Sequence, residues 1–501
     1  MFISGKKCEP SSLQKANVKN PATGELVGAV TLADEKTLQD AISSSKTAFD
    51  SWSKTDPKDR AFILGKVSAA LKEESIANEL AVLLTKEQGK PLKEARREIE
   101  GVTEVIDYFA SLSSVLLSPD AKFYQNSNGY AFVSKKPLGV CAAILPWNLP
   151  ALIFSWKVIP AILTGNTVVV KPSTDGPLTV LRLAEIFYES GLPAGVLNVV
   201  PATGELTGNV FATSPAVQKI SFTGSIETGK LLREKVFSAA NPVQKRLTLE
   251  LGGSDAMIVC GDVDVRWAAT EAVRARFFNC GQACVSPKRI FVFESIFEEF
   301  KKQVLAEVSK IHVGNGLESE TTMGPVCDKN QWERLIDVMG RIRLEILETE
   351  SDEIPGPGAG EILTGGNVLK ADRSGKPLNG YFFEPTVVAL APDRSKTSVL
   401  LREEIFGPVM VLVPVKDLND AIERSNDTIY GLGASVWTNN LKQAKTAVEQ
   451  LDVGIVWVNQ HARVLPSLPF GGVKESGIGR ENGEQVLNDY LETKTVVLKN
   501  V

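Results

Sequence analysis

The sequence contains 501 residues, of which 43% are hydrophobic and 23% are charged, and its formal net charge at pH 7 is −5. The length favours two or three domains, the acidic balance excludes a basic surface for nucleic acid, and no apolar run approaches the roughly 18 residues of a membrane helix. The first residues hold neither an apolar signal region nor an Arg-rich leader. We therefore expect a cytoplasmic protein whose partners are small molecules, with no nucleic acid and no membrane among them.

Six cysteines are scattered along the chain, which is typical of reduced thiols in a reducing compartment. Cys280 and Cys284 are spaced like a pair of metal ligands. The sequence has two histidines, however, His312 and His461, and no second cysteine pair follows. We therefore predict no metal site.

The N-terminal part of the chain is predicted to form short strands followed by helices. Strand signals surround a turn sequence at 20–24. From about 34 to 111, apolar residues recur three and four positions apart, which is the pattern of amphipathic helices that cover a sheet. Two stretches of strand character, 130–136 and 495–498, are far apart in the sequence. We expect them to pair into a small projecting sheet whose edge invites a second subunit.

Strands and helices alternate regularly from residue 139 onward, with short glycine-containing turns between them. This alternation predicts an α/β fold with a parallel, doubly wound sheet whose ligand site lies at the carboxyl ends of the strands. A second α/β segment follows and places Cys284 between a helix and a strand, and 348–360 is predicted to be an exposed loop. The predicted strands are 168–170, 196–200, 219–222, 257–259 and 290–292, and the predicted helices are 178–188, 205–212, 226–237, 267–278 and 297–308.

Cys284 and Glu250 are the two side chains most suited to covalent chemistry. Cys284 follows a Gly-Gln turn, and Glu250 ends a strand-like run before two glycines. Each also has a structural interpretation when taken alone, because an isolated intracellular cysteine is usually a small buried apolar residue and a glutamate at a strand end usually faces solvent. Together they offer a thiol nucleophile and a base for the water that clears a covalent intermediate.

Seven motifs occur in a fixed order along nearly the whole chain. They are PWNLP at 146–150, VKPS at 170–173, FTGS at 222–225, LELGG at 249–253, GQAC at 281–284, EEIFGP at 403–408 and PFGGVKESG at 469–477. In this order and at these separations the motifs resemble the NAD(P)-dependent aldehyde dehydrogenase superfamily, in its hydrolytic branch. The glycine-rich fingerprint of the usual dinucleotide fold is absent, as it is in that family.

The resemblance implies that the protein oxidises an aldehyde to the carboxylic acid while NAD(P) is reduced. Cys284 would attack the carbonyl to give a thiohemiacetal, whose oxyanion would be held by the side-chain amide of Asn148 and the backbone N–H of Cys284. Glu250 would then activate the water that hydrolyses the thioester. Lys157 and Glu481 match positions of a proton relay in relatives, with a structural ion pair as the equal alternative. Asn148 alone fits a turn residue between two prolines equally well.

The resemblance also implies a cofactor site. Lys171 matches a lysine that hydrogen-bonds the adenosine ribose, Glu404 matches a carboxylate that holds the nicotinamide ribose, and Phe406 would lie near the ring; alone, the first two also fit solvated surface residues. Family members strict for NAD often carry Glu where this chain has Thr174, so NAD is expected and NADP remains an alternative. The predicted cofactor residues are Ile144, Leu145, Pro146, Trp147, Lys171, Ser173, Thr174, Gly204, Phe222, Gly224, Ser225, Thr228, Leu251, Glu404 and Phe406.

The predicted substrate pocket is apolar and partly aromatic, which favours an uncharged aliphatic or aromatic aldehyde. Succinate semialdehyde dehydrogenases of this family carry arginines where this chain has Trp156 and Phe278. Some of the predicted walls also suit an ordinary core. His461 or Arg463, on the loop before Phe470, is a candidate to hydrogen-bond a polar substrate. The predicted walls are Leu149, Leu152, Trp156, Phe278, Ala283, Val285, Val464 and Phe470.

Three parts are expected from the resemblance. A Rossmann-type NAD(P)-binding domain would comprise 1–118 and 138–252, an α/β catalytic domain 253–475, and a small β oligomerisation element 119–137 and 488–501. The oligomer would be a homodimer or a homotetramer.

Two rival functions differ from this one in the residues that they need. A CoA-acylating enzyme generally lacks the carboxylate that Glu250 provides, so the presence of Glu250 favours hydrolysis. A non-catalytic ligand-binding or structural relative would be expected to have lost Cys284, Glu250 or Asn148, and all three are present.

Overall fold

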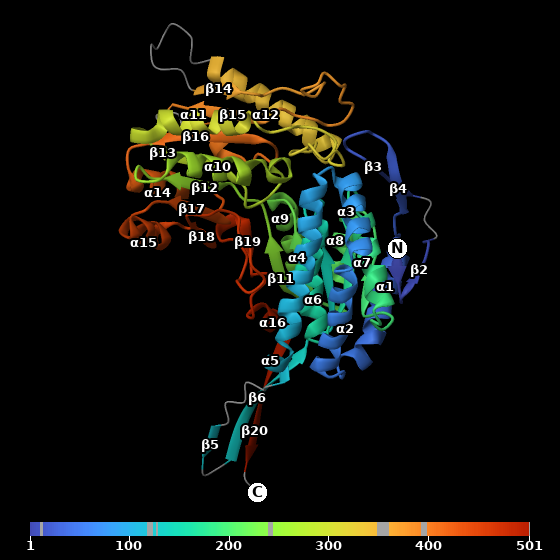
Figure 1. The fold of residues 1–501 in the computed structure, drawn as a ribbon. Helices are drawn as coiled ribbons and strands as arrows, with labels where there is room; N and C mark the ends of the chain where they lie inside the picture. Colours follow the sequence, from blue (N-terminus) through green and yellow to red (C-terminus); the bar gives the residue numbers. More distant parts are fainter. Residues whose placement is uncertain are drawn as a thin grey trace.

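The computed structural model describes residues 1–10, 14–117, 124–126, 129–238, 244–347, 360–391 and 398–499. These residues form two α/β units and a narrow sheet that projects from them (Figure 1). The predicted loop at 348–360 lies outside the described residues except for Gly360, as do residues 500–501 and most of 119–128.

The first unit is built on an eight-stranded sheet. Its strands lie in the order β19 (Gly477–Ile478), β11 (Arg246–Glu250), β10 (Val217–Thr223), β7 (Val140–Ile144), β8 (Thr167–Lys171), β9 (Leu197–Val199), β1 (Phe2–Ile3) and β2 (Lys6–Lys7). The five strands from β11 to β9 pair in parallel, and β19, β1 and β2 are antiparallel to their neighbours. After β7 the chain adds β8 and β9 on one side of it and then β10 and β11 on the other side. The carboxyl ends of β7 and β10 therefore form the switch point where open α/β sheets bind ligands.

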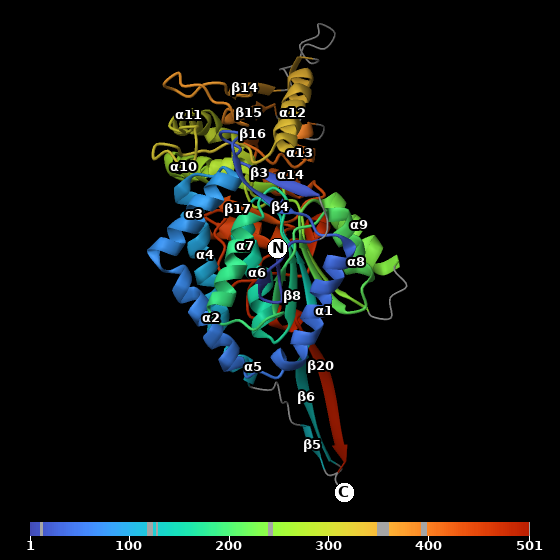
Figure 2. The ribbon, with the colours of Figure 1, turned by 90° about the vertical axis from the view of Figure 1, so that its right-hand side faces the viewer.

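Helices cover both faces of this sheet because successive side chains of each strand point to opposite faces. In β7, Cys141 and Ala143 pack into one core cluster, and Val140, Ala142 and Ile144 pack into the other. Figure 2 shows the sheet between the two helical layers. One layer contains α2 (Pro57–Leu71), α3 (Glu74–Gln88), α4 (Leu92–Ser111), α5 (Ser113–Leu117), α6 (Pro150–Leu163), α7 (Leu178–Glu189) and α16 (Val486–Asp489), and the other contains α1 (Glu35–Trp52), α8 (Gly204–Thr213) and α9 (Ile226–Ser238).

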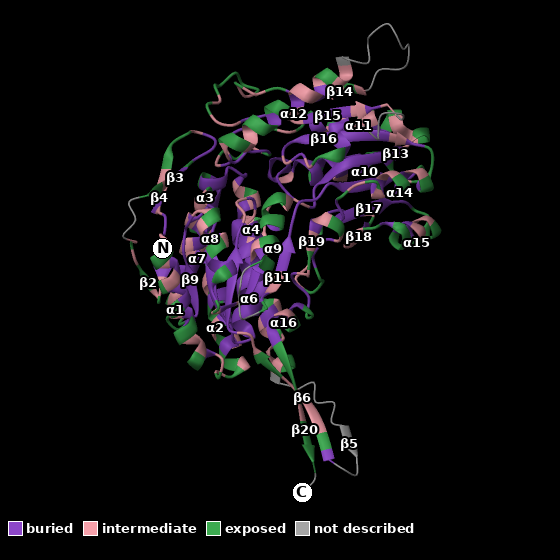
Figure 3. Cartoon of the chain, turned by 180° about the vertical axis from the view of Figure 1, so that it is seen from behind, coloured by how far each residue is buried: buried purple, intermediate pink, exposed green. Residues whose placement is uncertain are grey.

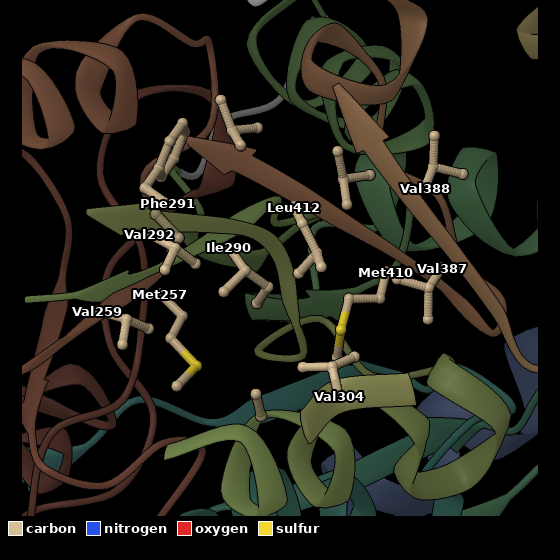
Figure 4. Packing of buried hydrophobic residues seen from close by; sticks show 14 of the residues in the cluster. Met257, Val259, Ile290, Phe291, Val292, Val304, Val387, Val388, Met410 and Leu412 are labelled. Carbon is tan, nitrogen blue, oxygen red and sulfur yellow. The ribbon is translucent and has the colours of Figure 1, made fainter. Parts of the chain in front are cut away.

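The second unit is built on a seven-stranded sheet. Its strands lie in the order β14 (Gly360–Thr364), β15 (Thr386–Leu390), β16 (Val409–Val415), β13 (Pro287–Phe293), β12 (Asp255–Val259), β17 (Gly433–Trp437) and β18 (Ile455–Val458), all parallel except β14. Met257, Ile290 and Leu412 lie fully buried at its centre (Figure 4). The helices of this unit are α10 (Val265–Phe277), α11 (Phe297–Val308), α12 (Lys329–Leu347), α13 (Val399–Arg402), α14 (Leu418–Asn426) and α15 (Leu441–Gln450).

A three-stranded sheet projects from the body. Strand β20 (Leu491–Lys499) pairs antiparallel with β6 (Gly129–Pro137) along its whole length, and β5 (Tyr124–Asn126) pairs with the tip of β6. Most of β20 is exposed (Figure 3). The predicted pairing of these distant segments is confirmed, while its role in oligomerisation stays a prediction. A separate hairpin joins β3 (Lys15–Lys19) to β4 (Leu26–Thr31).

The predicted α/β class with parallel sheets is confirmed, and the main errors lie at element ends. The predicted helix 267–278 is α10, which ends at Phe277 because Phe278 adopts an extended conformation with ψ of 135°. Including Phe278 in this helix was therefore wrong. Among the helices that the structure describes, none is long and apolar enough to cross a membrane.

Candidate active site

Two strand ends and one turn meet at the carboxyl edge of the first sheet. Glu250 is the last residue of β11, Asn148 follows β7, and Cys284 lies in the turn between α10 and β13. Cys284 and Glu250 both line a cavity of about 840 Å³ whose walls come from both units. The thiol and the carboxylate that the sequence singled out therefore share one space.

The turn that carries Cys284 has an unusual backbone. Asn279, Cys280 and Gly281 all have positive φ, at 50°, 56° and 70°. This left-handed conformation is uncommon for residues other than glycine and is maintained only where surrounding contacts enforce it. At Gly281 a side chain is also excluded by space, because a Cβ there would lie 2.3 Å from the carbonyl oxygen of Gly407.

A fully buried arginine holds this turn in place. Arg276 donates from Nη1 to Gly281 O at 3.2 Å and to Ser286 Oγ at 2.8 Å. It also donates from Nε to Val409 O at 2.7 Å and from Nη2 to Ile405 O at 3.1 Å. The planar guanidinium thus ties the nucleophile turn to the segment that contains Glu404 and Phe406, and sequence reasoning did not single it out.

Cys284 is half-buried, and its thiol is held in the protonated form. Burial raises the pKa of the Cys284 thiol to about 12; the positive charge of Lys288 opposes this shift, and the carboxyl groups of Asp255, Glu404 and Glu250 add to it. The thiolate is the reactive species. The pKa of the Cys284 thiol must therefore fall before attack, which requires positive charge to outweigh negative charge around the sulfur.

Asn148 is fixed by hydrogen bonds at both its side chain and its backbone oxygen. Its Nδ2 donates to Gln282 O at 3.0 Å, and its backbone oxygen accepts from Lys90 Nζ at 2.8 Å and from Asn279 Nδ2 at 3.0 Å. A side-chain amide carries two N–H donors. One N–H is therefore left for an oxyanion next to Cys284.

Glu250 is 3% exposed, and neither of its carboxyl oxygens has a hydrogen-bond partner among the described residues. Burial raises the pKa of Glu250 well above its usual value, the neighbouring Glu481 adds to the increase, and Lys157 opposes it. The loop at Gly471 packs against this carboxyl group, since a Cβ there would lie 2.6 Å from Glu250 Oε1. A poorly solvated carboxyl group with an elevated pKa is the expected state of a general base.

Lys157 and Glu481 form a buried ion pair of 2.7 Å, with side-chain exposures of 0% and 1%. Ser221 completes a triangle with them, because its Oγ lies 2.8 Å from Lys157 Nζ and donates to Glu481 Oε1 at 2.6 Å. Both predicted interpretations, a relay and an ion pair, are compatible with this geometry. Ser221 was missed, although its alternation with the buried Phe222 in β10 placed it on the face toward α6.

All eight predicted pocket walls line the cavity that contains Cys284 and Glu250. Trp156 and Phe470 form its aromatic part, with ring centroids 4.8 Å apart. The eight are Leu149, Leu152, Trp156, Phe278, Ala283, Val285, Val464 and Phe470.

His461 is already engaged on both ring nitrogens. Its Nε2 lies 2.9 Å from Val285 O, and its Nδ1 lies 2.7 Å from Ser435 Oγ. A carbonyl oxygen only accepts, so Nε2 carries the proton, and burial lowers the pKa of His461 to about 3. The ring supports the wall behind the nucleophile. Arg463 is exposed and lines the same cavity, so of the two candidates it is the one positioned to meet a polar substrate.

The predicted cofactor residues gather at the carboxyl ends of the parallel strands. Those from the first unit lie at or shortly after the ends of β7, β8, β10 and β11, or in the first turn of α8 or α9. Two more, Glu404 and Phe406, come from the second unit, and the Phe406 ring lies 5.5 Å from that of Trp147 in an edge-on contact. The first-unit set is Ile144, Leu145, Pro146, Trp147, Lys171, Ser173, Thr174, Gly204, Phe222, Gly224, Ser225, Thr228 and Leu251.

Comparison with known proteins identifies the family. The chain matches the model of the aldehyde dehydrogenase family over residues 8–496. Similar proteins include a phenylacetaldehyde dehydrogenase of Pseudomonas fluorescens, 37% identical over 99% of this chain and 95% of the relative, and retinaldehyde dehydrogenase 3 of Rattus norvegicus, 36% identical over 100% of this chain and 92% of the relative. The chain belongs to the aldehyde dehydrogenase family. It is therefore an NAD(P)-dependent oxidoreductase that converts an aldehyde to the acid, and the non-catalytic alternative is not favoured.

This aldehyde dehydrogenase also resembles solved structures throughout its length. An E. coli NADP-dependent enzyme superposes with a TM-score of 0.91 at 33% identity, covering 100% of this chain and 98% of that chain. Indole-3-acetaldehyde dehydrogenase AldA of P. syringae, solved as a cysteine-to-alanine mutant with NAD+ and IAA, superposes with a TM-score of 0.91 at 32% identity, covering 100% of this chain and 96% of that chain.

The side chains of this aldehyde dehydrogenase fit a dinucleotide at the switch point. Lys171 is 9% exposed, and within the described part of the chain its ammonium group makes no hydrogen bond, although Asp175 attracts it. Buried polar groups are normally hydrogen-bonded, so Lys171 is available to a ribose hydroxyl. Glu404 accepts from Gly253 N–H at 3.1 Å and has one carboxyl oxygen left for a second ribose.

Asp175 was missed by the reasoning on cofactor choice. It follows Thr174 directly, accepts from Ser173 Oγ at 3.3 Å and contributes the charge that attracts Lys171. A carboxylate therefore lies one position after Thr174 and close to Lys171. Within the described residues, no group of three or more His, Cys, Asp or Glu side chains is arranged to hold a metal ion, and all six cysteines are free thiols.

Proposed function

We propose that this aldehyde dehydrogenase oxidises uncharged aldehydes with an aliphatic or aromatic body, with Cys284 as the nucleophile and NAD as the preferred cofactor. In each turnover one aldehyde, one NAD+ and one water give one carboxylic acid, one NADH and one proton. The observation that carries the proposal is the cavity that Cys284 and Glu250 share, whose walls include all eight apolar residues predicted for the substrate pocket.

The first half of the reaction acylates the enzyme. The Cys284 thiolate attacks the carbonyl carbon, which turns the carbonyl oxygen into an oxyanion. The second amide N–H of Asn148 and the N–H of Cys284 are the proposed donors to this oxyanion. Among the described residues the Cys284 N–H has no other hydrogen-bond acceptor, which supports its role.

NAD(P) held at this site would supply the hydride acceptor for oxidation of the thiohemiacetal. The protein's part in this step is to hold the cofactor in place. Lys171 would donate to the adenosine ribose, Glu404 would accept from the nicotinamide ribose, and Trp147 and Phe406 would flank the site from the two units.

The second half hydrolyses the thioester. Glu250 takes a proton from water, the resulting hydroxide attacks the thioester carbon, and the C–S bond breaks to release the acid and the Cys284 thiolate. Glu250 must then lose the proton it gained. Lys157 and Glu481, which hydrogen-bond to each other and to Ser221, are the proposed route by which it leaves.

The substrate class follows from the cavity walls. Trp156 and Phe278 stand where a carboxylate-binding pocket of this family would need arginine, so a distal carboxylate would have no buried partner there. The phenylacetaldehyde and indole-3-acetaldehyde dehydrogenases among the similar proteins support an aromatic body.

The test is the appearance of reduced nicotinamide with a panel of aldehydes. Phenylacetaldehyde, hexanal and succinate semialdehyde should be compared with NAD and with NADP, in the wild type and in Cys284→Ala. We expect the aromatic and aliphatic aldehydes with NAD to be preferred and all activity to vanish in the variant. Retention of activity in Cys284→Ala would remove the proposed nucleophile, and a preference for succinate semialdehyde would overturn the substrate class.

We further propose a homo-oligomer, a dimer or a tetramer, located in the cytoplasm. The exposed strand β20 and its partner β6 supply a sheet edge suited to pairing with another copy, and six free thiols suit a reducing compartment. Light scattering of the full chain and of a variant lacking residues 491–499 checks the first proposal, because a monomer in the wild type would contradict it. Cell fractionation checks the second.

A further inference from the structure

A buried lysine, Lys288, lies directly behind Cys284 and takes no part in the proposed reaction steps. Lys288 is the second residue of β13, four positions after Cys284, and its side chain is 3% exposed. Its Nζ donates to Ala283 O at 3.0 Å and to Cys284 O at 3.0 Å. Two of its three N–H donors therefore fix the peptide planes on either side of the Cys284 nitrogen and carbonyl.

The third donor faces the cofactor side of the site. Lys288 Nζ lies 3.6 Å from Glu404 Oε1, and it stands 5.9 Å from the centre of the Phe406 ring. Glu404 in turn is held by Gly253 N–H at 3.1 Å. One ammonium group thus touches both the peptide of the nucleophile and the carboxylate assigned to the nicotinamide ribose.

The charges around Lys288 come from four separate parts of the chain. Glu404 and Asp255 carry potential negative charge, Arg276 carries positive charge, and Cys284 becomes negative when it ionises. Asp255 is fully buried and uses Oδ1 to accept from Gly433 N–H at 3.0 Å. Opposite charges attract strongly where water is excluded. When Asp255 or Glu404 is protonated, it no longer offsets the positive charge of Lys288, and that charge then stabilises the Cys284 thiolate more strongly.

We propose that Lys288 is a positioning residue that fixes the peptide of Cys284 and favours its thiolate form by charge. The inference rests on the proposed role of Cys284 as the nucleophile. It goes beyond that role by assigning the activation of the thiol to a residue that does not line the cavity.

A purely structural role is the competing explanation, and the chain contains a matched control for it. Lys245 is also a buried lysine that donates to two backbone carbonyls, Ser214 O at 2.5 Å and Val217 O at 2.6 Å. It lies before β11 in the first unit and does not line the cavity. Lys245→Gln therefore reports what the loss of a buried lysine does by itself.

The experiment follows alkylation of the full-length protein without cofactor or aldehyde. Iodoacetamide is added between pH 6 and pH 10, and the modification of Cys284 is quantified by peptide mass spectrometry. Cys8 is half-buried, and its alkylation in the same sample is the internal control. The variants are Lys288→Gln, Lys288→Arg, Glu404→Gln and Lys245→Gln.

We expect Lys288→Gln to move the rate profile of Cys284 to higher pH by about one unit, which is the lower end of the effect of a close opposite charge. The rate at a fixed neutral pH then falls about tenfold. Lys288→Arg should restore the rate because it keeps the charge, and Glu404→Gln should raise it because a nearby negative charge is removed. Lys245→Gln and the Cys8 rate should not change.

Equal Cys284 profiles in Lys288→Gln and the wild type would overturn the proposal. So would a loss of rate in Lys288→Gln that Lys288→Arg does not restore while Glu404→Gln leaves the rate unchanged, because that pattern indicates disturbed packing. The outcome is independent of the dehydrogenase reaction. If Cys284→Ala kept its activity, the proposed function would fail while the alkylation data would still report the effect of Lys288.

Discussion

Replacing Glu250 by Gln separates the two halves of the proposed reaction. Neither carboxyl oxygen of Glu250 has a hydrogen-bond partner among the described residues, so the amide removes the base without breaking a contact. General-base catalysis is worth about 10²–10⁴ in rate, which corresponds to about 3–5 kcal/mol of transition-state free energy. Acylation and hydride transfer do not use Glu250, so only hydrolysis should slow by this factor.

The assay is rapid mixing of the Glu250→Gln variant with saturating aldehyde and NAD, monitored by the absorbance of the reduced nicotinamide. A burst of one equivalent per active site should be followed by a steady rate at least about 100-fold below that of the wild type. Acid quenching should recover the acyl group on the Cys284 peptide. A variant that turns over at a wild-type rate, or one that shows no burst, would refute the assignment of Glu250 to hydrolysis.

The same variant has a predicted signature in stability. Burial raises the pKa of folded Glu250 well above the usual value of 4.5. Between these two pKa values the unfolded chain has lost the proton while the folded protein keeps it, so wild-type stability decreases as pH rises through this window. Glu250→Gln removes this loss. It should therefore be increasingly more stable than the wild type from pH 5 upward in thermal unfolding, and Glu234→Gln, at an exposed position, should show no such trend.

Four further substitutions test neighbouring parts of the site. Glu481→Gln removes a negative charge that raises the pKa of Glu250, so the pH profile of thioester hydrolysis should shift to lower pH, whereas Lys157→Met should shift it to higher pH; shifts in the same direction would contradict the coupling. Trp156→Ala should cost about 3–5 kcal/mol in denaturant unfolding and raise kcat/KM for bulkier aldehydes relative to hexanal; an unchanged ranking would place Trp156 outside the substrate path. Asp175→Asn should raise kcat/KM for NADP relative to NAD on the order of fivefold by removing a charge near the ribose, and an unchanged ratio would leave cofactor choice to other residues.

Most of the fold was predictable because its signals are local. Short apolar runs alternate with helical periodicity in the central region, from β8 to α11. Each strand and helix predicted there from this alternation is present in the structure. The pairing of β6 with β20 was also predicted, from strand character alone. Helix ends were less predictable, since α10 stops at Phe277 because Phe278 is extended and the turn after it adopts left-handed backbone angles. That conformation depends on contacts from Arg276, which no local pattern reports.

The site was predictable where residues carry chemistry and unpredictable where they act through position. Cys284 and Glu250 were singled out because a thiol and a carboxylate have recognisable uses, whereas the eight pocket walls were predicted from the family resemblance. All of them line one cavity. Ser221 and Lys288 were missed because each occupies an ordinary position in an apolar strand. A lysine inside the buried strand β13 was nevertheless a readable signal, since lysine is almost never fully buried without a partner.

Two kinds of buried ionisable group lie within this site, and their hydrogen bonds distinguish them. Arg276 has backbone and hydroxyl acceptors around its whole guanidinium group, so its charge is balanced in the resting protein and it serves to hold the turn. Glu250 is buried, and its carboxyl oxygens have no hydrogen-bond partner among the described residues. Burying such a group costs stability, and a group kept in this state is a candidate for a role in the reaction. Variants of the first kind should lose stability and activity together. Variants of the second kind should lose activity while stability is kept or increased, and this contrast gives a way to sort the buried charges around Cys284 without a bound ligand.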